Sequence, residues 1–382
     1  MPSLVKSTPE TFHFPLGLAQ GEYFCNRVSE TERLVKNLQS HTHTLLIAPR
    51  RYGKTSLAYR AIHLSKMPSA KVDLFMSTSL EDIQQAILKG INELISETAG
   101  VTEKLLDSLK TFVKSLKLSL EATADGFKIS LTPGQNSAPS QNICEALQIL
   151  DQILIKKEIS AVLLIDEFQE IELIAPNQGI EGAIRHVAQG AQRFSIIFSG
   201  SQQTLLKSMF NSKNKPLYRL CDEITLSRIE EKDYEIFVNQ FAQKKWNQKI
   251  QKAVFESLVQ LTHLHPYYFN ALLREAFQLE TPPSAETLEN LWKDLADKKR
   301  QDLLSETENL NITQKKMLVA IANGINQELT SKEFLSKFEL ASSSVLRALN
   351  TLMENDLIEL REDKYHLIDP LLEFVILKLQ II

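Results

Sequence analysis

Four short apolar runs in the first part of the chain predict β-strands that are buried on both faces. They lie at 44–48, 71–76, 161–165 and 194–198. Because these runs are apolar rather than alternating, they are typical of a parallel sheet covered on both sides. Stretches with helical spacing separate them, such as 56–66, 80–96 and 143–155. This alternation of strands and helices predicts an α/β class with a doubly wound parallel sheet.

An alternating pattern interrupts this order between residues 116 and 133. Apolar and polar residues alternate on both sides of the pair Asp125-Gly126. An Asp-Gly pair between alternating stretches is a signal for a tight hairpin turn. We therefore expect a hairpin inserted into the sheet domain, followed by a polar loop at 132–140.

The pattern becomes helical after Ile224. Four segments carry apolar residues at helical spacing, at 230–245, 250–262, 266–278 and 285–304. These segments predict an α-helical lid domain that follows the sheet.

The last part of the chain predicts a winged helix. Three short helices are expected at 313–322, 330–337 and 342–353, the second and third capped by Ser331 and Ser342. Two short strands flanking Arg361-Glu362-Asp363 then form a small hairpin. The expected organisation is a leader at 1–20, a sheet domain at 21–227, a lid at 228–305 and a winged helix at 306–382.

Composition narrows the classes of function. The chain has 43 Lys and Arg against 47 Asp and Glu, a net charge of −4. This balance argues against a protein whose main task is to coat nucleic acid. Cys25, Cys144 and Cys221 are far apart and form no Cys-x-x-Cys pair, so neither a disulfide framework nor a zinc site is expected. Inert thiols in a reducing compartment are the simplest interpretation.

We expect a cytoplasmic protein that has no membrane partner. Residues 1–17 lack the basic region and apolar run of a signal peptide. The most apolar stretch, 371–382, is interrupted by Glu373 and Lys378. It is also shorter than the roughly 20 apolar residues that span a bilayer.

The loop from Ala48 to Thr55 carries the clearest chemical signal. It matches the phosphate-binding pattern G-x-x-x-x-G-K-[ST] except that Ala48 stands at the first glycine. A strand precedes the loop and a helix follows it, so backbone N–H groups and the helix N-terminus would face an anion. Lys54 would reach the β- and γ-phosphates of ATP, and the Thr55 hydroxyl would ligate Mg²⁺. A chance loop containing Gly53-Lys54-Thr55 is the alternative.

A second element lies at the end of the run 161–165, where Asp166 and Glu167 follow an apolar strand. In P-loop enzymes a strand-end Asp binds Mg²⁺ directly or through water. A Glu placed next to it can polarise the attacking water. A strand that ends in a solvated acidic turn is the alternative, but two such elements in the expected order favour the enzymatic interpretation.

The third element is the end of the run 194–198, which leads into Ser199-Gly200-Ser201. A polar side chain at this strand end can touch the γ-phosphate and orient water. Ser199 is the preferred candidate and Ser201 the second. A strand that simply runs into a glycine turn remains the alternative.

Taken together, these motifs resemble the archaeal-type ATPase family. That family belongs to the STAND class of the AAA+-like P-loop ATPases. The resemblance covers residues 20–275 and extends to the winged-helix ending Tyr365-His366-Leu367-Ile368-Asp369-Pro370. Besides the three elements above, it rests on Phe24-Cys25-Asn26-Arg27, Pro216-Leu217-Tyr218-Arg219 and His265-Pro266-Tyr267-Tyr268. Ala48 and Asn26 stand where glycine is more usual in the family.

The resemblance implies roles for individual residues. Thr55 and Asp166 would hold Mg²⁺, Glu167 would act on water, and Arg219 would present a guanidinium to the γ-phosphate. Phe24 to Arg27 would lie near adenine and the lid, and His265-Pro266 would begin a lid helix near the base. The implied ATP-binding residues are Phe24, Asn26, Arg27, Pro49, Arg50, Arg51, Tyr52, Gly53, Lys54, Thr55, Ser56, His265 and Pro266.

Three functions are compatible with these signals. The first is a slow ATP hydrolase that acts as a nucleotide-dependent switch, as the family resemblance implies. The second is an ATP-controlled regulator that binds DNA through the winged helix. The third, a scaffold with an inactive nucleotide site, is disfavoured because Lys54, Thr55, Asp166 and Glu167 are all present.

The charge of the winged helix bears on the choice of partner. Residues 313–382 carry eight Lys and Arg against ten Asp and Glu, a net charge of −2. Its predicted recognition helix contains a single cation, Arg347. Because strong DNA binding usually needs several cations, a protein partner or self-association is preferred to DNA.

Overall fold

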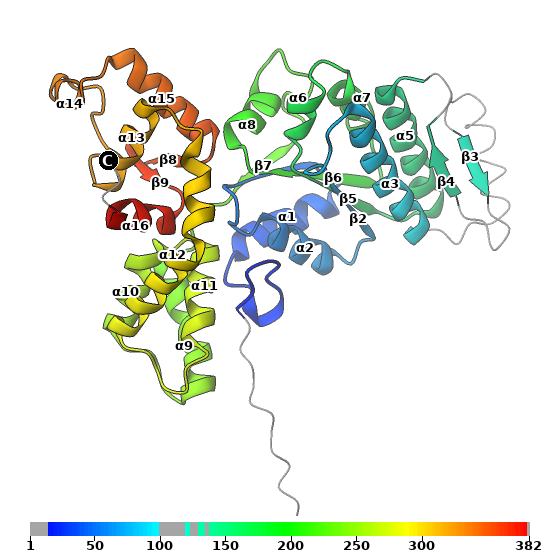
Figure 1. Ribbon diagram of the computed structural model, residues 1–382. Helices are drawn as coiled ribbons and strands as arrows, with labels where there is room; N and C mark the ends of the chain where they lie inside the picture. Colours follow the sequence, from blue (N-terminus) through cyan, green and yellow to red (C-terminus); the bar gives the residue numbers. More distant parts are fainter. Residues whose placement is uncertain (1–13, 99–118, 123–128, 134–136, 380–382) are drawn as a thin grey trace, which may run out of the picture. The chain divides into compact units, whose positions relative to one another are not determined.

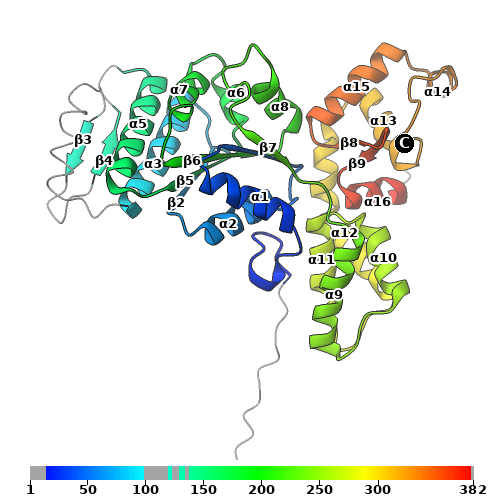
Figure 2. The same ribbon diagram turned by 180° about the vertical axis from the view of Figure 1, so that it is seen from behind.

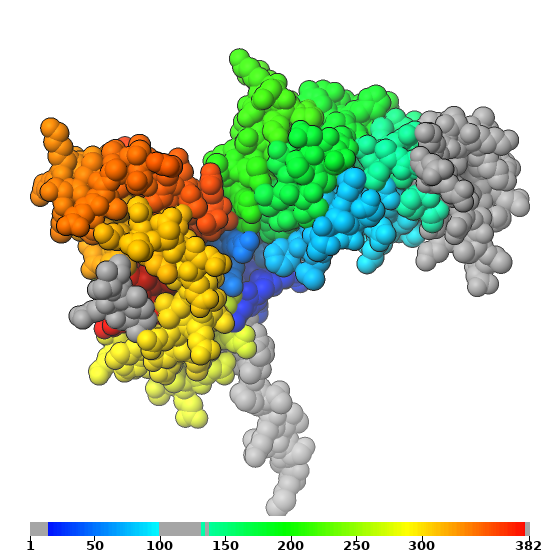
Figure 3. Space-filling model, turned by 45° about the horizontal axis from the view of Figure 1, so that its top comes forward, coloured from blue at the N-terminus to red at the C-terminus, as the bar shows by residue number. Residues whose placement is uncertain are grey.

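The computed structural model describes residues 14–98, 119–122, 129–133 and 137–379 (Figure 1). By its contacts the chain divides into two units. The sheet unit consists of Arg27–Pro49 and Lys54–Leu226. The helical unit consists of Arg50–Gly53, Ser227–Ile382 and the residues up to Asn26. Figure 3 shows the surfaces of both units in the same colours.

The sheet unit confirms the predicted α/β class. Its five strands are all parallel and lie in the order β2-β5-β6-β1-β7. Their bounds are β1 Thr44–Ile47, β2 Ser69–Asp73, β5 Ala161–Asp166, β6 Phe194–Gly200 and β7 Asp222–Thr225. The central strands are buried along their whole length, as continuous apolar runs require.

One strand boundary differs from the prediction. The run at 71–76 was expected to be a strand throughout, but β2 starts at Ser69 and ends at Asp73. The Asp73 carboxylate accepts a hydrogen bond from the Phe75 backbone N–H at 3.2 Å. This bond, an Asx-type turn, competes with a continued strand. Phe75 and Met76 consequently leave the sheet and are exposed.

Helices cover both faces of this sheet (Figures 1 and 2). On one face α1 and α2 pack together, and on the other α3 packs on α5, which packs on α7. Gly90 of α3 allows close approach to β2, because a Cβ there would lie 2.4 Å from the Val72 Cγ2 atom. The bounds are α1 Val28–Gln39, α2 Lys54–Ser65, α3 Leu80–Thr98, α5 Pro139–Lys157, α6 Glu170–Ile174, α7 Ile180–Ala188 and α8 Gln203–Asn211.

A separate two-stranded sheet lies in the region of the expected hairpin. Strands β3 (Ser119–Ala122) and β4 (Ile129–Thr132) pair antiparallel. The Asn92 side chain of α3 accepts a hydrogen bond from the Leu131 N–H at 2.8 Å and donates one to the Leu131 carbonyl oxygen at 3.0 Å. The expected turn at Asp125-Gly126 lies outside the described residues.

The helical unit contains two groups of elements. The first is α9 Glu231–Trp246, α10 Lys252–Thr262, α11 Pro266–Ala276 and α12 Ala285–Glu308. The second is α13 Ile312–Ala322, α14 Lys332–Phe338, α15 Ser342–Glu354, the hairpin β8 Ile358–Arg361 with β9 Lys364–Leu367, and α16 Pro370–Leu379. One apolar core, which includes Trp292 and Tyr268, joins both groups. The short helix η1 (Gly21–Tyr23) also belongs to this unit.

Two predictions at helix ends had different outcomes. Ser331 caps α14 by accepting a hydrogen bond from the Phe334 N–H. The expected cap at Ser342 is wrong, because Ala341 is the N-cap and Ser342 is already the first helical residue of α15. A Cβ methyl group offers no acceptor, so α15 begins without a side-chain cap.

The apolar stretch at 371–382 forms α16 as far as Leu379. Its Leu371, Leu372 and Val375 side chains are buried in the core of the helical unit. Asp369 caps the helix by accepting hydrogen bonds from the N–H groups of Leu371 and Leu372, at 2.8 Å and 3.0 Å. None of the described helices has the length and apolar character that crossing a membrane requires.

Candidate active site

The carboxyl ends of the parallel strands bring the predicted site residues to one edge of the sheet. Asp73 of β2 lies in register with Asp166 of β5. Ile165 is in register with Phe198 of β6, and Gly200 of β6 with Ile47 of β1. The residues that follow Ile47, Ile165 and Phe198 therefore meet at one edge, where open α/β sheets bind their ligands.

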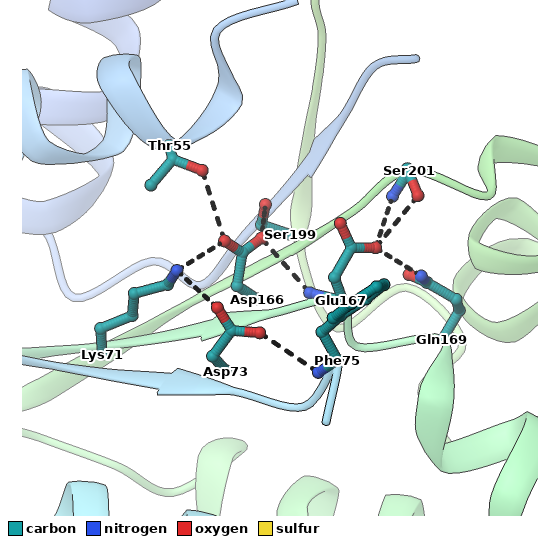
Figure 4. A network of polar contacts seen from close by, with 9 residues as sticks. All are labelled: Thr55, Lys71, Asp73, Phe75, Asp166, Glu167, Gln169, Ser199 and Ser201. Carbon is teal, nitrogen blue, oxygen red and sulfur yellow. Dashed lines mark hydrogen bonds and ion pairs between the residues drawn. The ribbon is translucent and has the colours of Figure 1, made fainter. Parts of the chain in front are cut away.

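Asp166 is the centre of the polar network at this edge (Figure 4). Its Oδ1 atom accepts a hydrogen bond from the buried Ser199 hydroxyl at 2.8 Å. Its Oδ2 atom accepts one from the Thr55 hydroxyl at 3.3 Å and forms an ion pair with the Lys71 ammonium at 3.1 Å. Burial raises the pKa of Asp166, but the Ser199 hydrogen bond and the Lys71 charge outweigh it and hold the pKa below its ordinary value.

Glu167 is held by a different set of donors. One oxygen of its carboxylate accepts hydrogen bonds from the Gln169 amide and from both the N–H and the hydroxyl of Ser201, the latter two at 3.2 Å and 3.0 Å. Glu167 adopts a positive φ of 52°, outside the extended region, and β5 ends at the residue before it. The two adjacent carboxylates thus have separate hydrogen-bond partners, Ser199 for Asp166 and Ser201 for Glu167 (Figure 4).

Gly200 makes the contact between Gln169 and Glu167 possible. A Cβ at this position would lie 2.0 Å from the Gln169 Oε1 atom and 2.9 Å from a methyl carbon of Leu206. Gln169 is almost fully buried, and its Oε1 atom has no hydrogen-bond partner within the described part of the chain.

Lys54 is the first residue of α2, and its side chain folds back over the start of the loop that precedes the helix. Its buried ammonium donates to the carbonyl oxygens of Ala48 and Pro49, at 2.9 Å and 3.1 Å. Gly53 has a φ of 89°, which favours glycine, and Arg51 has a φ of 64°. Ser56 is buried in the first turn of α2. Arg51 and Gly53 are therefore the left-handed residues of the loop, and anion-binding nests are built where left-handed residues alternate with right-handed ones.

The tip of this loop, Arg50 to Gly53, packs within the helical unit. The Arg51 guanidinium lies over the Tyr267 ring, 4.5 Å from its centroid. The Tyr52 ring meets the His265 ring edge to face at 4.9 Å, and its hydroxyl accepts a hydrogen bond from the Arg228 Nε atom at 3.0 Å. Burial raises the pKa of Tyr52 to about 12, so this hydroxyl stays protonated at neutral pH.

His265 is the N-cap of α11, and Pro266 is its first residue. The His265 ring is 3% exposed, and its Nδ1 atom has no hydrogen-bond partner among the described residues. Burial, together with the positive charges of Arg228 and Arg51, lowers the pKa of His265 to about 3. The ring is therefore neutral, with a buried nitrogen that is free to accept or donate one hydrogen bond.

The remaining predicted residues are not part of the Asp166 network. In the helical unit Phe24 is half-buried, and the Asn26 amide donates to the Asp233 carboxylate. In the sheet unit Arg27 is buried and forms an ion pair with Glu30 at 3.1 Å. Arg219 is exposed before β7, with its guanidinium over the neighbouring Tyr218 ring.

Sequence reasoning missed three members of the network, namely Lys71, Asp73 and Gln169. Lys71 and Asp73 are charged residues two positions apart in an apolar run, a spacing that places both on one face of a strand. That spacing was the available signal for the pair. Gln169 follows Glu167 by two residues, and only the turn after β5 brings its amide back to the carboxylate.

The donor set fits a magnesium ion that is shared with a phosphate group. The Thr55 hydroxyl and the Asp166 carboxylate are hard oxygen ligands at hydrogen-bond distance from each other. Mg²⁺ usually takes one or two such protein ligands and completes its shell with water and phosphate oxygens. Within the described residues, no group of three or more His, Cys, Asp or Glu side chains could bind a metal by itself.

The family described as "Probable winged helix domain" matches residues 302–378. No curated protein sequence matches the chain. The Walker-type ATPase paby2304 of Pyrococcus abyssi is similar in structure, with a TM-score of 0.68, 18% identity, and coverage of 95% of this chain and 99% of that one.

The ORC2 protein of Aeropyrum pernix, in its ADPNP-ADP complexes, gives a TM-score of 0.53 at 13% identity, with 93% of this chain and 95% of that one covered. At these identities the likeness concerns the fold. The chain combines an α/β fold like that of Walker-type ATPases with a C-terminal winged helix.

Proposed function

We propose that this protein is a Mg²⁺-dependent ATPase that acts as a nucleotide-dependent conformational switch. One observation carries the proposal. Thr55, Asp166, Glu167 and Ser199 converge at the carboxyl edge of the sheet, where the loop ending in Lys54 and Thr55 enters α2.

In this proposal the loop binds the phosphates of ATP. The Lys54 ammonium exchanges its two loop carbonyls for phosphate oxygens, which are stronger charge-assisted acceptors. Thr55 and Asp166 hold Mg²⁺, and Ser199 keeps the Asp166 carboxylate oriented. When bound, the ion neutralises charge that develops on the phosphate oxygens.

Glu167 is the residue that acts on water. Asp166 is a poor base, because its hydrogen bond and ion pair favour the charged form and lower its pKa. Gln169 and Ser201 occupy one oxygen of Glu167 and fix the direction of the carboxylate. Its second oxygen can accept a proton from the attacking water.

The switch part of the proposal rests on the loop tip. Arg228 donates to the Tyr52 hydroxyl and also forms an ion pair with Glu359 of β8 at 3.2 Å. The same guanidinium donates to the His263 carbonyl oxygen. A change in loop conformation on phosphate binding would therefore alter contacts that reach the winged helix. Slow hydrolysis would return the loop to its first state, and the winged helix would present the change to a protein partner or a second copy of the chain.

Lys54→Ala tests the ATP site directly. Losing a hydrogen bond to a charged group should weaken ATP binding by about 1.5–3 kcal/mol, which is roughly 10- to 150-fold. Isothermal titration calorimetry with Mg-ATP measures this change. Lys89→Ala, which alters an exposed lysine of α3, serves as the control and should bind like wild type. Equal affinity in wild type and Lys54→Ala would refute the assignment of the loop.

A DNA-binding regulator is the second candidate. A groove of about 620 Å³ lies between α13 and α15, and its lining includes Lys315, Arg347 and Ser344. Two cations and a hydroxyl can contact phosphates, but the net charge of −2 over residues 313–382 opposes a DNA backbone. Sub-micromolar binding of duplex DNA by the full-length protein at physiological salt, measured by fluorescence anisotropy, would favour this function.

A further inference from the structure

The Lys71 ammonium forms an ion pair with the carboxylate that is proposed to bind the metal, Asp166. This ammonium lies 3.1 Å from Asp166 Oδ2 and 2.8 Å from Asp73 Oδ2 (Figure 4). Parallel pairing explains this geometry. Asp73 is in register with Asp166, and Lys71 precedes Asp73 by two residues on the same face of β2.

The oxygen that Lys71 contacts is also the oxygen proposed to bind the metal. Asp166 Oδ2 accepts a hydrogen bond from the Thr55 hydroxyl, so Thr55 and Lys71 both contact this one oxygen atom. A divalent cation and an ammonium group on the same oxygen would repel each other strongly, because both lie within a few ångströms of it. Asp73 offers Lys71 a second acceptor, and the flexible lysine side chain can move toward it.

We propose that Lys71 is an internal competitor of Mg²⁺: it neutralises Asp166 when no metal is bound, and it moves onto Asp73 when the metal binds. Lys71 thereby sets the Mg²⁺ concentration that the nucleotide site requires. This inference rests on the proposed Mg-ATP site. It adds a positioning residue that belongs neither to the loop nor to the acidic pair Asp166-Glu167 at the end of β5.

Replacing Lys71 should lower the Mg²⁺ concentration that nucleotide binding requires, whereas replacing Asp73 should raise it. In Lys71→Met the competitor is lost, so tight nucleotide binding should need roughly 3- to 10-fold less free Mg²⁺. In Asp73→Asn the second negative charge is lost and only a neutral amide oxygen is left, so Lys71 stays on Asp166 and more Mg²⁺ should be needed. If Asp73 acts through Lys71, the double variant should behave like Lys71→Met alone.

The experiment measures the binding of a fluorescent ATP analogue to the full-length protein over a series of free MgCl₂ concentrations. Lys89→Met is the matched control, since Lys89 is an exposed lysine of the same unit, and its midpoint should equal that of wild type. Thermal unfolding with MgCl₂ and no nucleotide is a second readout. Mg²⁺ should raise the unfolding temperature of Lys71→Met more than that of wild type, because Asp73 and Asp166 then lack their shared cation.

Several results would overturn the inference. An unchanged Mg²⁺ midpoint in Lys71→Met would show that the ion pair is only structural. Additive shifts in the double variant would show that the two charges act independently through space. If wild type binds the analogue at no Mg²⁺ concentration, the proposed function fails as well, whereas normal binding with an unchanged midpoint rejects the role of Lys71 alone.

Discussion

Replacing Gly200 by alanine should separate ATP binding from ATP hydrolysis. The new Cβ would lie 2.0 Å from Gln169 Oε1 and 2.9 Å from a Leu206 methyl carbon. Gln169 is almost fully buried, so it cannot move aside without disturbing its surroundings. Its amide would then lose contact with Glu167, leaving that carboxylate without one of its positioning donors.

The size of the effect follows from these contacts. Overpacking of a buried site costs about 1–3 kcal/mol, which should appear as a lower unfolding temperature. A positioned general base contributes about 10²–10⁴-fold to a rate, so a misdirected Glu167 should lose a large part of that factor. ATP affinity should stay near wild type, because Lys54 and Thr55 lie outside the clash.

Three measurements on purified variants test this reasoning: ATP turnover, calorimetric ATP binding and thermal unfolding. Gly182→Ala is the matched control, because a Cβ at Gly182 of α7 would meet nothing within 4 Å. Adding Gln169→Ala to Gly200→Ala should restore part of the stability by removing the clash with Gln169, although the Leu206 contact remains, and should leave turnover low. Wild-type turnover in Gly200→Ala, or recovered turnover in the double variant, would refute the link between Gly200, Gln169 and Glu167.

Four further predictions concern the metal, the switch and pH. Asp166→Asn should weaken Mg²⁺-dependent binding of ATP, whereas Glu167→Gln should keep binding and lose hydrolysis; wild-type turnover in Glu167→Gln would place the base elsewhere. Arg219→Ala should lower turnover without changing the unfolding temperature, and full activity would reject the role at the γ-phosphate that the family resemblance implies. Arg228→Ala should change the protease sensitivity of the winged helix and abolish the change in that sensitivity that we expect ATP to cause in wild type. If ATP leaves the digestion pattern of wild type unaltered, the switch is rejected. The pKa of His265 is about 3 in the folded state and near 6.5 when unfolded, so the unfolded chain takes up the proton first. His265 should therefore lower the stability by up to ~1.4 kcal/mol per pH unit as the pH falls from 6.5 to about 3. Chemical denaturation of His265→Gln should show a shallower slope, with His263, whose pKa is about 4, still contributing.

Local signals in the sequence were sufficient for most of the secondary structure. Continuous apolar runs predicted β1, β5 and β6, and helical spacing predicted α9 to α15 apart from shifts at their ends. The loop at 48–55 and the pair Asp166-Glu167 could be identified because each depends on adjacent residues and on the strand before them. The end of β2 was misplaced, because a side-chain bond from Asp73 outweighs the apolar character of 74–76.

Only the tertiary structure decided which side chains meet. Asp73 and Asp166 are far apart in the sequence and become neighbours because β2 pairs with β5 in one particular register. Nothing local to Lys71 indicates that it reaches the carboxylate that also contacts Thr55. Likewise, the packing of Arg51 and Tyr52 with Tyr267, His265 and Arg228 depends on how α11 and its flanking loops fold back within the helical unit. Hydrophobic periodicity determines which face of a helix or strand is buried. Strand register and helix packing determine which other elements lie beside it. The network around Asp166 therefore depends on the tertiary structure, because its members come from neighbouring elements.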